Sequence, residues 1–133
     1  MKIGLLERVP LFSGCSKREL GEIALIADEL DLPQGATIIR EGERGREFIV
    51  LVEGSARVTR RGKKIGDLGA GDWVGEIALV ADVPRTATVT ALTPLRTLVV
   101  ADRSFRRLLE KHPSIAAKIL QTLGSRLAAD ERA

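Results

Sequence analysis

Short apolar and β-branched runs alternate with glycine-containing or charged turns between Leu30 and Asp102. The turns fall at residues 33–35, 42–45, 54, 61–63 and 93–94. The runs lie at Leu30–Leu32, Thr37–Arg40, Phe48–Val52, Ser55–Thr59, Lys64–Leu68, Thr86–Ala91 and Leu95–Val100. Strands at this spacing, about seven or eight of them, predict a closed antiparallel sandwich or jelly roll.

A helical pattern precedes these strands. Ser16-Lys-Arg-Glu19 is a capping box, and apolar residues follow it at helical spacing, which predicts a helix over about Lys17–Asp28. Residues 2–12 mix apolar and charged positions and meet Pro10, so we expect at most one helical turn there before a loop.

Two helices are predicted after the strands. The first begins with Ser104 as N-cap and ends at Lys111 before Pro113, and the second runs over Ser114–Arg132. Along the second, an apolar stripe recurs at steps of four and three, and it faces either the strands or a partner. The stripe consists of Ala116, Leu120, Leu123 and Leu127.

The predicted fold is therefore mainly β with flanking helices, an antiparallel β-roll or jelly roll with an N-terminal helix and a C-terminal helix pair. We expect one domain over residues 1–133, since 133 residues with 44% hydrophobic content are enough for one core. Its parts are an N-terminal helical segment (1–29), the β-roll (30–102) and the C-terminal helices (103–133).

Composition and the N-terminus bear on location and partners. No apolar run reaches eighteen residues and Met1-Lys-Ile-Gly lacks a secretory signal, so we expect a cytoplasmic protein without a membrane segment. The single cysteine, Cys15, cannot form an internal disulfide and is expected to be an inert, partly buried thiol. A net charge of +3 suits an anionic ligand without requiring nucleic acid.

The stretch from Gly69 to Val89 carries the candidate chemistry. Gly75 permits positive-φ backbone, and residues 76–81 are long enough for a short helix whose free amides and dipole fit an anion. Pro84 ends that helix, and Arg85 begins the strand that follows. A helix N-terminus, the Glu76 carboxylate and the Arg85 guanidinium together suit a ligand with both an anion and a hydroxyl, such as a ribose phosphate.

Gly75-Glu76-Ile77-Ala78-Leu79 followed by Pro84-Arg85-Thr86-Ala87-Thr88 resembles the phosphate-binding cassette of cyclic nucleotide-binding domains, here residues 75–87. The order of helix, β-roll and helices is also that of this family. The resemblance implies that Glu76 accepts a hydrogen bond from the ribose 2′-hydroxyl. It also implies that the cyclic phosphate is held by Gly75, Ile77, Ala78, Arg85 and Thr86.

The same resemblance places the base between the strands and the final helix. Val58 and Ile65 align with apolar base contacts of the family, although both also fit as core strand residues. Asp130 aligns near the point where the final helix meets the base, although it is also readable as a solvated residue of a frayed helix end. A carboxylate there would favour guanine, which has two donors on that edge.

Catalysis is not expected. Metal enzymes on jelly rolls use several histidines, and this chain has one, His112, at a helix junction, so we expect neither a metal nor a cofactor. The Walker sequence and any serine or cysteine triad are also absent from the sequence. The resemblance extends to the sensor half of catabolite-activator transcription factors, but the sequence ends at Ala133 without a helix-turn-helix, so this chain alone should not bind DNA.

The sequence thus predicts a non-catalytic regulatory module that binds a cyclic nucleotide, with cAMP preferred and cGMP as the alternative. It also fits a sensor fragment of a larger transcription factor, channel or enzyme. Ligand would draw the final helix over the base, and the leucine stripe could form a homodimer seam. The basic cluster Arg57, Arg60, Arg61, Lys63 and Lys64 is expected to be solvated at a hairpin tip.

Overall fold

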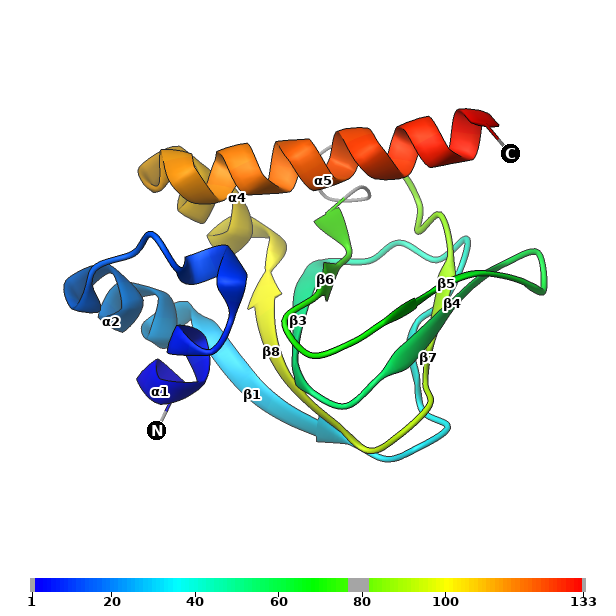
Figure 1. Cartoon of the computed structure of the whole chain (residues 1–133), viewed down its shortest axis with the longest axis horizontal. Helices are drawn as coiled ribbons and strands as arrows, with labels where there is room; N and C mark the ends of the chain where they lie inside the picture. The colour runs from blue at the N-terminus through cyan, green and yellow to red at the C-terminus, as the bar shows by residue number, and fades with distance from the viewer. Residues whose placement is uncertain (1, 77–81, 133) are drawn as a thin grey trace.

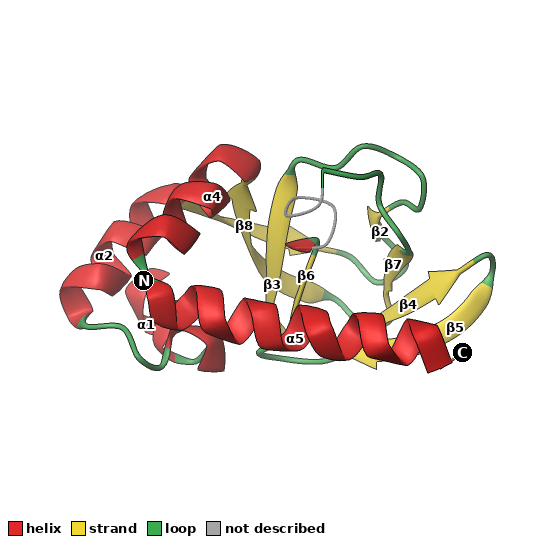
Figure 2. Cartoon of the chain, turned by 90° about the horizontal axis from the view of Figure 1, so that it is seen from above, coloured by secondary structure: helices red, strands yellow, loops and turns green. Residues whose placement is uncertain are grey.

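The computed structural model describes residues 2–76 and 82–132. Short helices gather at one end of the strands, and the final helix runs from that end across β6 (Trp73–Val74) toward the hairpin of β4 (Ala56–Arg60) and β5 (Lys63–Leu68), as Figures 1 and 2 show. The described elements are α1 (Lys2–Glu7), η1 (Pro10–Phe12), α2 (Lys17–Ile26), β1 (Ala27–Leu32), β2 (Thr37–Ile39), β3 (Glu47–Glu53), β4 (Ala56–Arg60), β5 (Lys63–Leu68), β6 (Trp73–Val74), β7 (Thr88–Ala91), β8 (Leu95–Ala101), α4 (Asp102–Lys111) and α5 (Pro113–Arg132).

The strands form two four-stranded antiparallel sheets, in the orders β1-β8-β3-β6 and β2-β7-β4-β5. Mainly β architecture with flanking helices is therefore confirmed. The closure that the strand spacing suggested is absent among the described strands. Each sheet has an edge strand too short to extend the pairing, with three residues in β2 and two in β6.

Strand β3 separates two hydrophobic cores because both of its faces are buried. Phe48 and Val50 point into the core beneath the helices, whereas Ile49 and Leu51 point into the core between the sheets. This alternation follows from the two-residue period of a strand. Phe48 stacks on Phe105 of α4 with ring centroids 4.5 Å apart, which fixes the helical end against the sheet.

The helix boundaries follow from local hydrogen bonds. The capping box is confirmed, since Ser16 Oγ accepts from the Glu19 amide at 3.2 Å and a Glu19 oxygen accepts from the Ser16 amide at 2.9 Å. Helix α2 ends at Ile26, earlier than predicted, because Ala27 is already part of β1, where it pairs with Val100 of β8.

The prediction that Ser104 is an N-cap is wrong. Helix α4 begins at Asp102, directly after β8, and Ala101 occupies the N-cap position. The Asp102 amide donates to the Arg46 carbonyl at 2.7 Å, so the chain turns into the helix as soon as the strand ends.

The turns of the sheets use glycine at positive φ at Gly35, Gly42, Gly54, Gly71 and Gly75, which confirms the conformation predicted for Gly75. Between the last two of these lies β6, which the sequence analysis missed because two residues carry no periodicity. Strand β7 begins at Thr88 rather than at Thr86. Within the described ranges, no helix combines the length and apolar character needed to span a membrane.

Candidate functional site

Arg85 is a buried cation held by two backbone carbonyls. Only 7% of the residue is exposed, and its guanidinium donates to the Gly75 carbonyl at 3.1 Å and to the Glu47 carbonyl at 2.8 Å. Burial lowers the pKa of Arg85, while the charges of Glu47 and Glu76 raise it. Because an arginine titrates far above neutrality, the group keeps its charge and offers a fixed positive centre.

Two glycines make room for this guanidinium. Gly75 has φ +102°, and a Cβ there would lie 2.7 Å from the Glu47 carbonyl oxygen and 2.8 Å from an Arg85 nitrogen. At Gly45, a Cβ would lie 1.6 Å from Arg85 Nε. The sequence singled out Gly75, but it gave Gly45 only as part of a turn, since its contact with Arg85 spans the fold.

Glu76 is a fully buried carboxylate whose two oxygens differ in their hydrogen-bond partners. Its exposure is 0%, and Oε1 accepts a hydrogen bond from Arg126 of α5. Among the described residues, no donor lies within hydrogen-bonding distance of Oε2. A buried acceptor without a hydrogen bond destabilises a folded protein by about 1–3 kcal/mol. A ligand hydroxyl that donates to Oε2 would remove this cost, which favours binding of that ligand.

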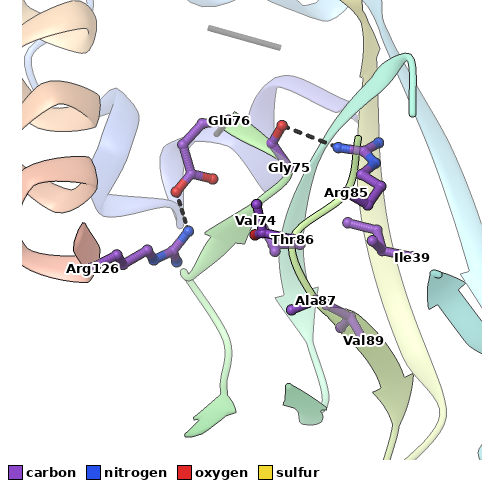
Figure 3. A pocket seen from close by; sticks show the side chains of 9 residues that line it. All are labelled: Ile39, Val74, Gly75, Glu76, Arg85, Thr86, Ala87, Val89 and Arg126. Atoms are coloured by element: carbon purple, nitrogen blue, oxygen red, sulfur yellow. Dashed lines mark hydrogen bonds and ion pairs between the residues drawn. The ribbon is translucent and has the colours of Figure 1, made fainter. Parts of the chain in front are cut away.

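Arg126 is a site residue that the sequence analysis missed. It also donates to the Trp73 carbonyl at 2.6 Å, so α5 is tied to both β6 and Glu76. Figure 3 shows Arg126 and Arg85 on opposite sides of the Gly75–Glu76 step. Its position in the sequence could have indicated this contact. Arg126 lies three residues after Leu123, so it borders the apolar stripe of α5 that faces the strands or a partner.

Two neighbouring cavities surround these groups. The first, the cassette cavity, has a volume of about 40 Å³ and includes Glu76, Arg85 and Thr86 in its lining (Figure 3). The second, the β4–β5 cavity, has a volume of about 210 Å³ and is lined in part by Val58 and Ile65. Four residues line both cavities: Val74, Thr86, Ala87 and Arg126.

The basic cluster of the β4–β5 hairpin is not solvated throughout. Arg60 Nε donates to the Thr86 carbonyl at 2.8 Å, which corrects the expectation that Arg60 is a solvated tip residue. The hydrogen bond exists because β4 pairs with β7 and so brings Arg60 beside the cassette. Arg57 and Lys64 instead pair with Asp67 at the surface, and Arg57 lowers the pKa of that carboxyl.

The remaining predicted site residues lie outside what the structure describes. Ile77 and Ala78 fall within residues 77–81, as does most of the short helix predicted over residues 76–81. Asp130 belongs to α5, but its side chain is outside the described part of the chain, as is that of Leu127. Gly75, Glu76, Arg85 and Thr86 are described, and all four line the cassette cavity.

A family model described as a cyclic nucleotide-binding domain matches residues 29–112. The chain therefore belongs to the cyclic nucleotide-binding domain family, as the cassette resemblance predicted. Over the matched residues the chain is a regulatory ligand-binding module rather than a catalytic domain, in agreement with relatives that are kinase regulatory subunits.

Two curated relatives illustrate the family. The cAMP-dependent protein kinase regulatory subunit of Yarrowia lipolytica is 37% identical over 108 residues, covering 80% of this chain and 29% of that protein. A cyclic nucleotide-gated potassium channel of Rhizobium etli is 36% identical over 118 residues, covering 89% of this chain and 33% of the channel. The chain thus spans a third or less of these relatives.

A solved structure gives the same fold assignment. The cAMP-bound structure of PfPKA-R matches with a TM-score of 0.89 and 27% sequence identity, covering 98% of this chain and 45% of that one. The helical end, both sheets and α5 are therefore shared architecture.

Proposed function

We propose that this chain binds a cyclic nucleotide, with cAMP as the preferred ligand, in the two cavities beneath α5. The observation that carries the proposal is the buried Oε2 of Glu76, which has no hydrogen-bond partner among residues 2–76 and 82–132 and lies in the same cavity as the Arg85 cation. A cyclic nucleotide offers a hydroxyl for the first group and an anion for the second.

The cyclic phosphate is assigned to Arg85. Its hydrogen bonds to Gly75 and Glu47 engage part of a guanidinium that has five N–H donors, which leaves donors for phosphate oxygens. A charge-assisted contact in a partly shielded cavity is stronger than one in water. Thr86 and the amides of residues 75, 77 and 78 complete the phosphate contacts in this proposal.

The ribose is assigned to Glu76. Its Oε2 accepts from the 2′-hydroxyl while Oε1 stays on Arg126, so both oxygens of the buried carboxylate are then satisfied. The 3′,5′-cyclic phosphate leaves the 2′-hydroxyl free, which a 2′-deoxy analogue lacks.

The base is assigned to the β4–β5 cavity, against the apolar side chains of Val58 and Ile65. Ile65 is 50% exposed, so its contact surface is open to a ligand. The cAMP bound by PfPKA-R supports adenine as first choice. cGMP is the alternative if Asp130 of α5 accepts from the two guanine donors.

Movement of α5 is the proposed signal. Each cavity is smaller than the roughly 300–1,000 Å³ of a typical ligand pocket, and Arg126 lines both. We infer that a nucleotide filling both cavities moves Arg126 and α5 together while Arg126 keeps its contact with Glu76 Oε1, which couples the ligand to the position of the final helix. An unidentified effector protein or domain would detect that shift.

The wider setting is inferred from the relatives. We place the module in the cytoplasm as part of a larger transcription factor, channel or enzyme, without DNA binding of its own. Leu120 is 62% exposed on α5, which supports a homodimer seam with Leu123 and Leu127. Sedimentation of the protein at about a hundred micromolar tests this dimer seam. A monomer both with and without nucleotide would contradict the proposed homodimer.

Calorimetric titration with cAMP, cGMP and AMP tests the function. We expect saturable binding of cAMP with one ligand per chain, weaker binding of cGMP and no comparable binding of AMP. Equal affinity for AMP would show that the cyclic phosphate is not recognised, and absence of binding to all three would overturn the proposal.

A further inference from the structure

Cys15, Glu19 and His112 form a cluster outside the proposed nucleotide site. Cys15 lies just before α2, Glu19 lies in its first turn, and His112 joins α4 to α5. The thiol sulfur, a carboxylate oxygen and a ring nitrogen all lie within 4.8 Å of one another. Glu19 Oε2 and His112 Nδ1 are 2.9 Å apart. We propose that these three side chains bind a divalent metal ion, and that Zn²⁺ fits them best.

The ligand types favour zinc. Thiolate, imidazole and carboxylate are the three donors that Zn²⁺ takes in proteins, and three protein ligands plus water is a common arrangement. In a tetrahedral site with ordinary bond lengths, the ligand atoms lie about 3.4–3.6 Å from one another. The cluster reaches this arrangement if the Glu19–His112 contact opens by roughly half an ångström and the sulfur moves inward.

Backbone hydrogen bonds hold the main chain of Cys15 and His112 in place. The His112 amide donates to the Leu108 carbonyl at 3.0 Å, and the His112 carbonyl accepts from the amides of Ile115 and Ala116. The Cys15 amide donates to the Phe12 carbonyl at 3.0 Å. These bonds fix the start of α2 and the α4–α5 junction, so little ordering remains when a metal binds.

The Glu19 carboxylate is divided between two roles. One oxygen accepts from the Ser16 amide in the capping box, which leaves the other oxygen aimed at His112. Zinc would bind this second oxygen without disturbing the helix cap. Glutamine also satisfies a capping box, so Glu19→Gln removes the charged metal ligand while keeping the cap.

Charge at the cluster can neutralise a divalent cation. Zinc binding releases the Cys15 thiol proton to solvent, and the resulting thiolate and the Glu19 carboxylate together balance the two positive charges. Burial and the Glu19 charge raise the pKa of the Cys15 thiol, whereas Lys118 lowers it. The Lys118 ammonium donates to the Pro10 carbonyl at 2.9 Å and to the Ser13 hydroxyl at 2.8 Å.

The proposed zinc site differs from the prediction, made from the sequence, that the chain binds no metal. That expectation concerned catalytic centres with several histidines, whereas 93 residues separate Glu19 from His112 in this cluster. A zinc ion here would join α2 to the junction from which α5 begins, and would raise the melting temperature by binding the folded state alone.

The test uses the full chain without an affinity tag, freed of metal with a chelator. Calorimetric titration with ZnCl₂ is expected to show one ion per chain with a micromolar or lower Kd. Losing an outer partner of a zinc ligand weakens binding about 10- to 100-fold, so Cys15→Ser and Glu19→Gln should each weaken it at least that much. Glu110→Gln, an exposed carboxylate of α4, is the matched control and should leave the Kd unchanged.

Cobalt provides a spectroscopic check. The chain has one cysteine, so a thiolate-to-cobalt charge-transfer band with Co²⁺ can arise only from Cys15 and must vanish in Cys15→Ser. Circular dichroism verifies that each variant is folded. A zinc Kd above about 1 mM, an unchanged Kd in Cys15→Ser, or cobalt binding without the band would each overturn the proposal.

Discussion

Glu76 of the cassette accepts a hydrogen bond from Arg126 of α5, fifty positions away in the sequence. The carboxylate is fully buried, whereas the Arg126 side chain is 29% exposed. The pair therefore joins a fixed group of the site to a helix at the surface. This relationship gives the proposed signal a physical basis, because any ligand that displaces Arg126 also acts on α5.

Arg85→Ala is expected to weaken cAMP binding more than any other single arginine substitution. Truncating one partner of a buried charge pair costs about 2–5 kcal/mol, or roughly 30-fold to several thousand-fold in affinity. Calorimetry measures the loss, and Arg96→Ala on β8, whose side chain pairs with Asp31 at the surface, is the control. A loss below about threefold in a folded Arg85→Ala variant would remove Arg85 from the phosphate site.

Gly45→Ala should weaken cAMP binding by displacing Arg85, although less than Arg85→Ala does. The new Cβ overlaps the Arg85 guanidinium, so the cation must leave its position between the two carbonyls. We expect cAMP affinity to fall about tenfold or more. Gly21→Ala, where a Cβ meets no atom within 4 Å, is the control. Wild-type affinity in Gly45→Ala would mean that the position of Arg85 does not matter for binding.

Arg126→Ala is expected to lower both stability and nucleotide affinity. The substitution leaves the buried Glu76 carboxylate without its hydrogen-bond donor, which should cost about 1–3 kcal/mol in the free energy of unfolding. Urea denaturation measures this cost, and calorimetry measures cAMP binding. Arg126→Lys, which keeps the charge but loses the two-pronged contact with Glu76 and Trp73, should fall between wild type and alanine. Unchanged stability in Arg126→Ala would show that the pair contributes nothing to the fold.

Asp130→Ala tests base choice. If the carboxylate accepts from guanine, cGMP affinity should fall by about fivefold or more while cAMP affinity changes by less than about twofold. Glu131→Ala is the neighbouring control, and the two ligands are compared by calorimetry. Equal effects on both nucleotides, or none on either, would exclude Asp130 from the selection of the base.

The features that could be predicted from the sequence are those that depend on residues close together in the chain. Strand runs, the Ser16–Glu19 capping box and the glycine at residue 75 each follow from spacing or backbone conformation over a few residues. The contact of Arg126 with Glu76 does not, because it depends on where α5 crosses the sheets. The same holds for Gly45 beside Arg85 and for Cys15, Glu19 and His112, which lie far apart in the sequence and meet only in the fold.

The most direct measurement compares cAMP with 2′-deoxy-cAMP by calorimetry on wild type and Glu76→Gln. Removing a hydrogen bond to a charged group costs about 1.5–3 kcal/mol, so wild type should bind cAMP roughly 10- to 150-fold more tightly than the deoxy analogue. Glu76→Gln should shrink that ratio, since a neutral amide forms a weaker hydrogen bond with the hydroxyl than the carboxylate does. Equal binding of both nucleotides to the wild-type chain would contradict the assignment of the ribose to Glu76.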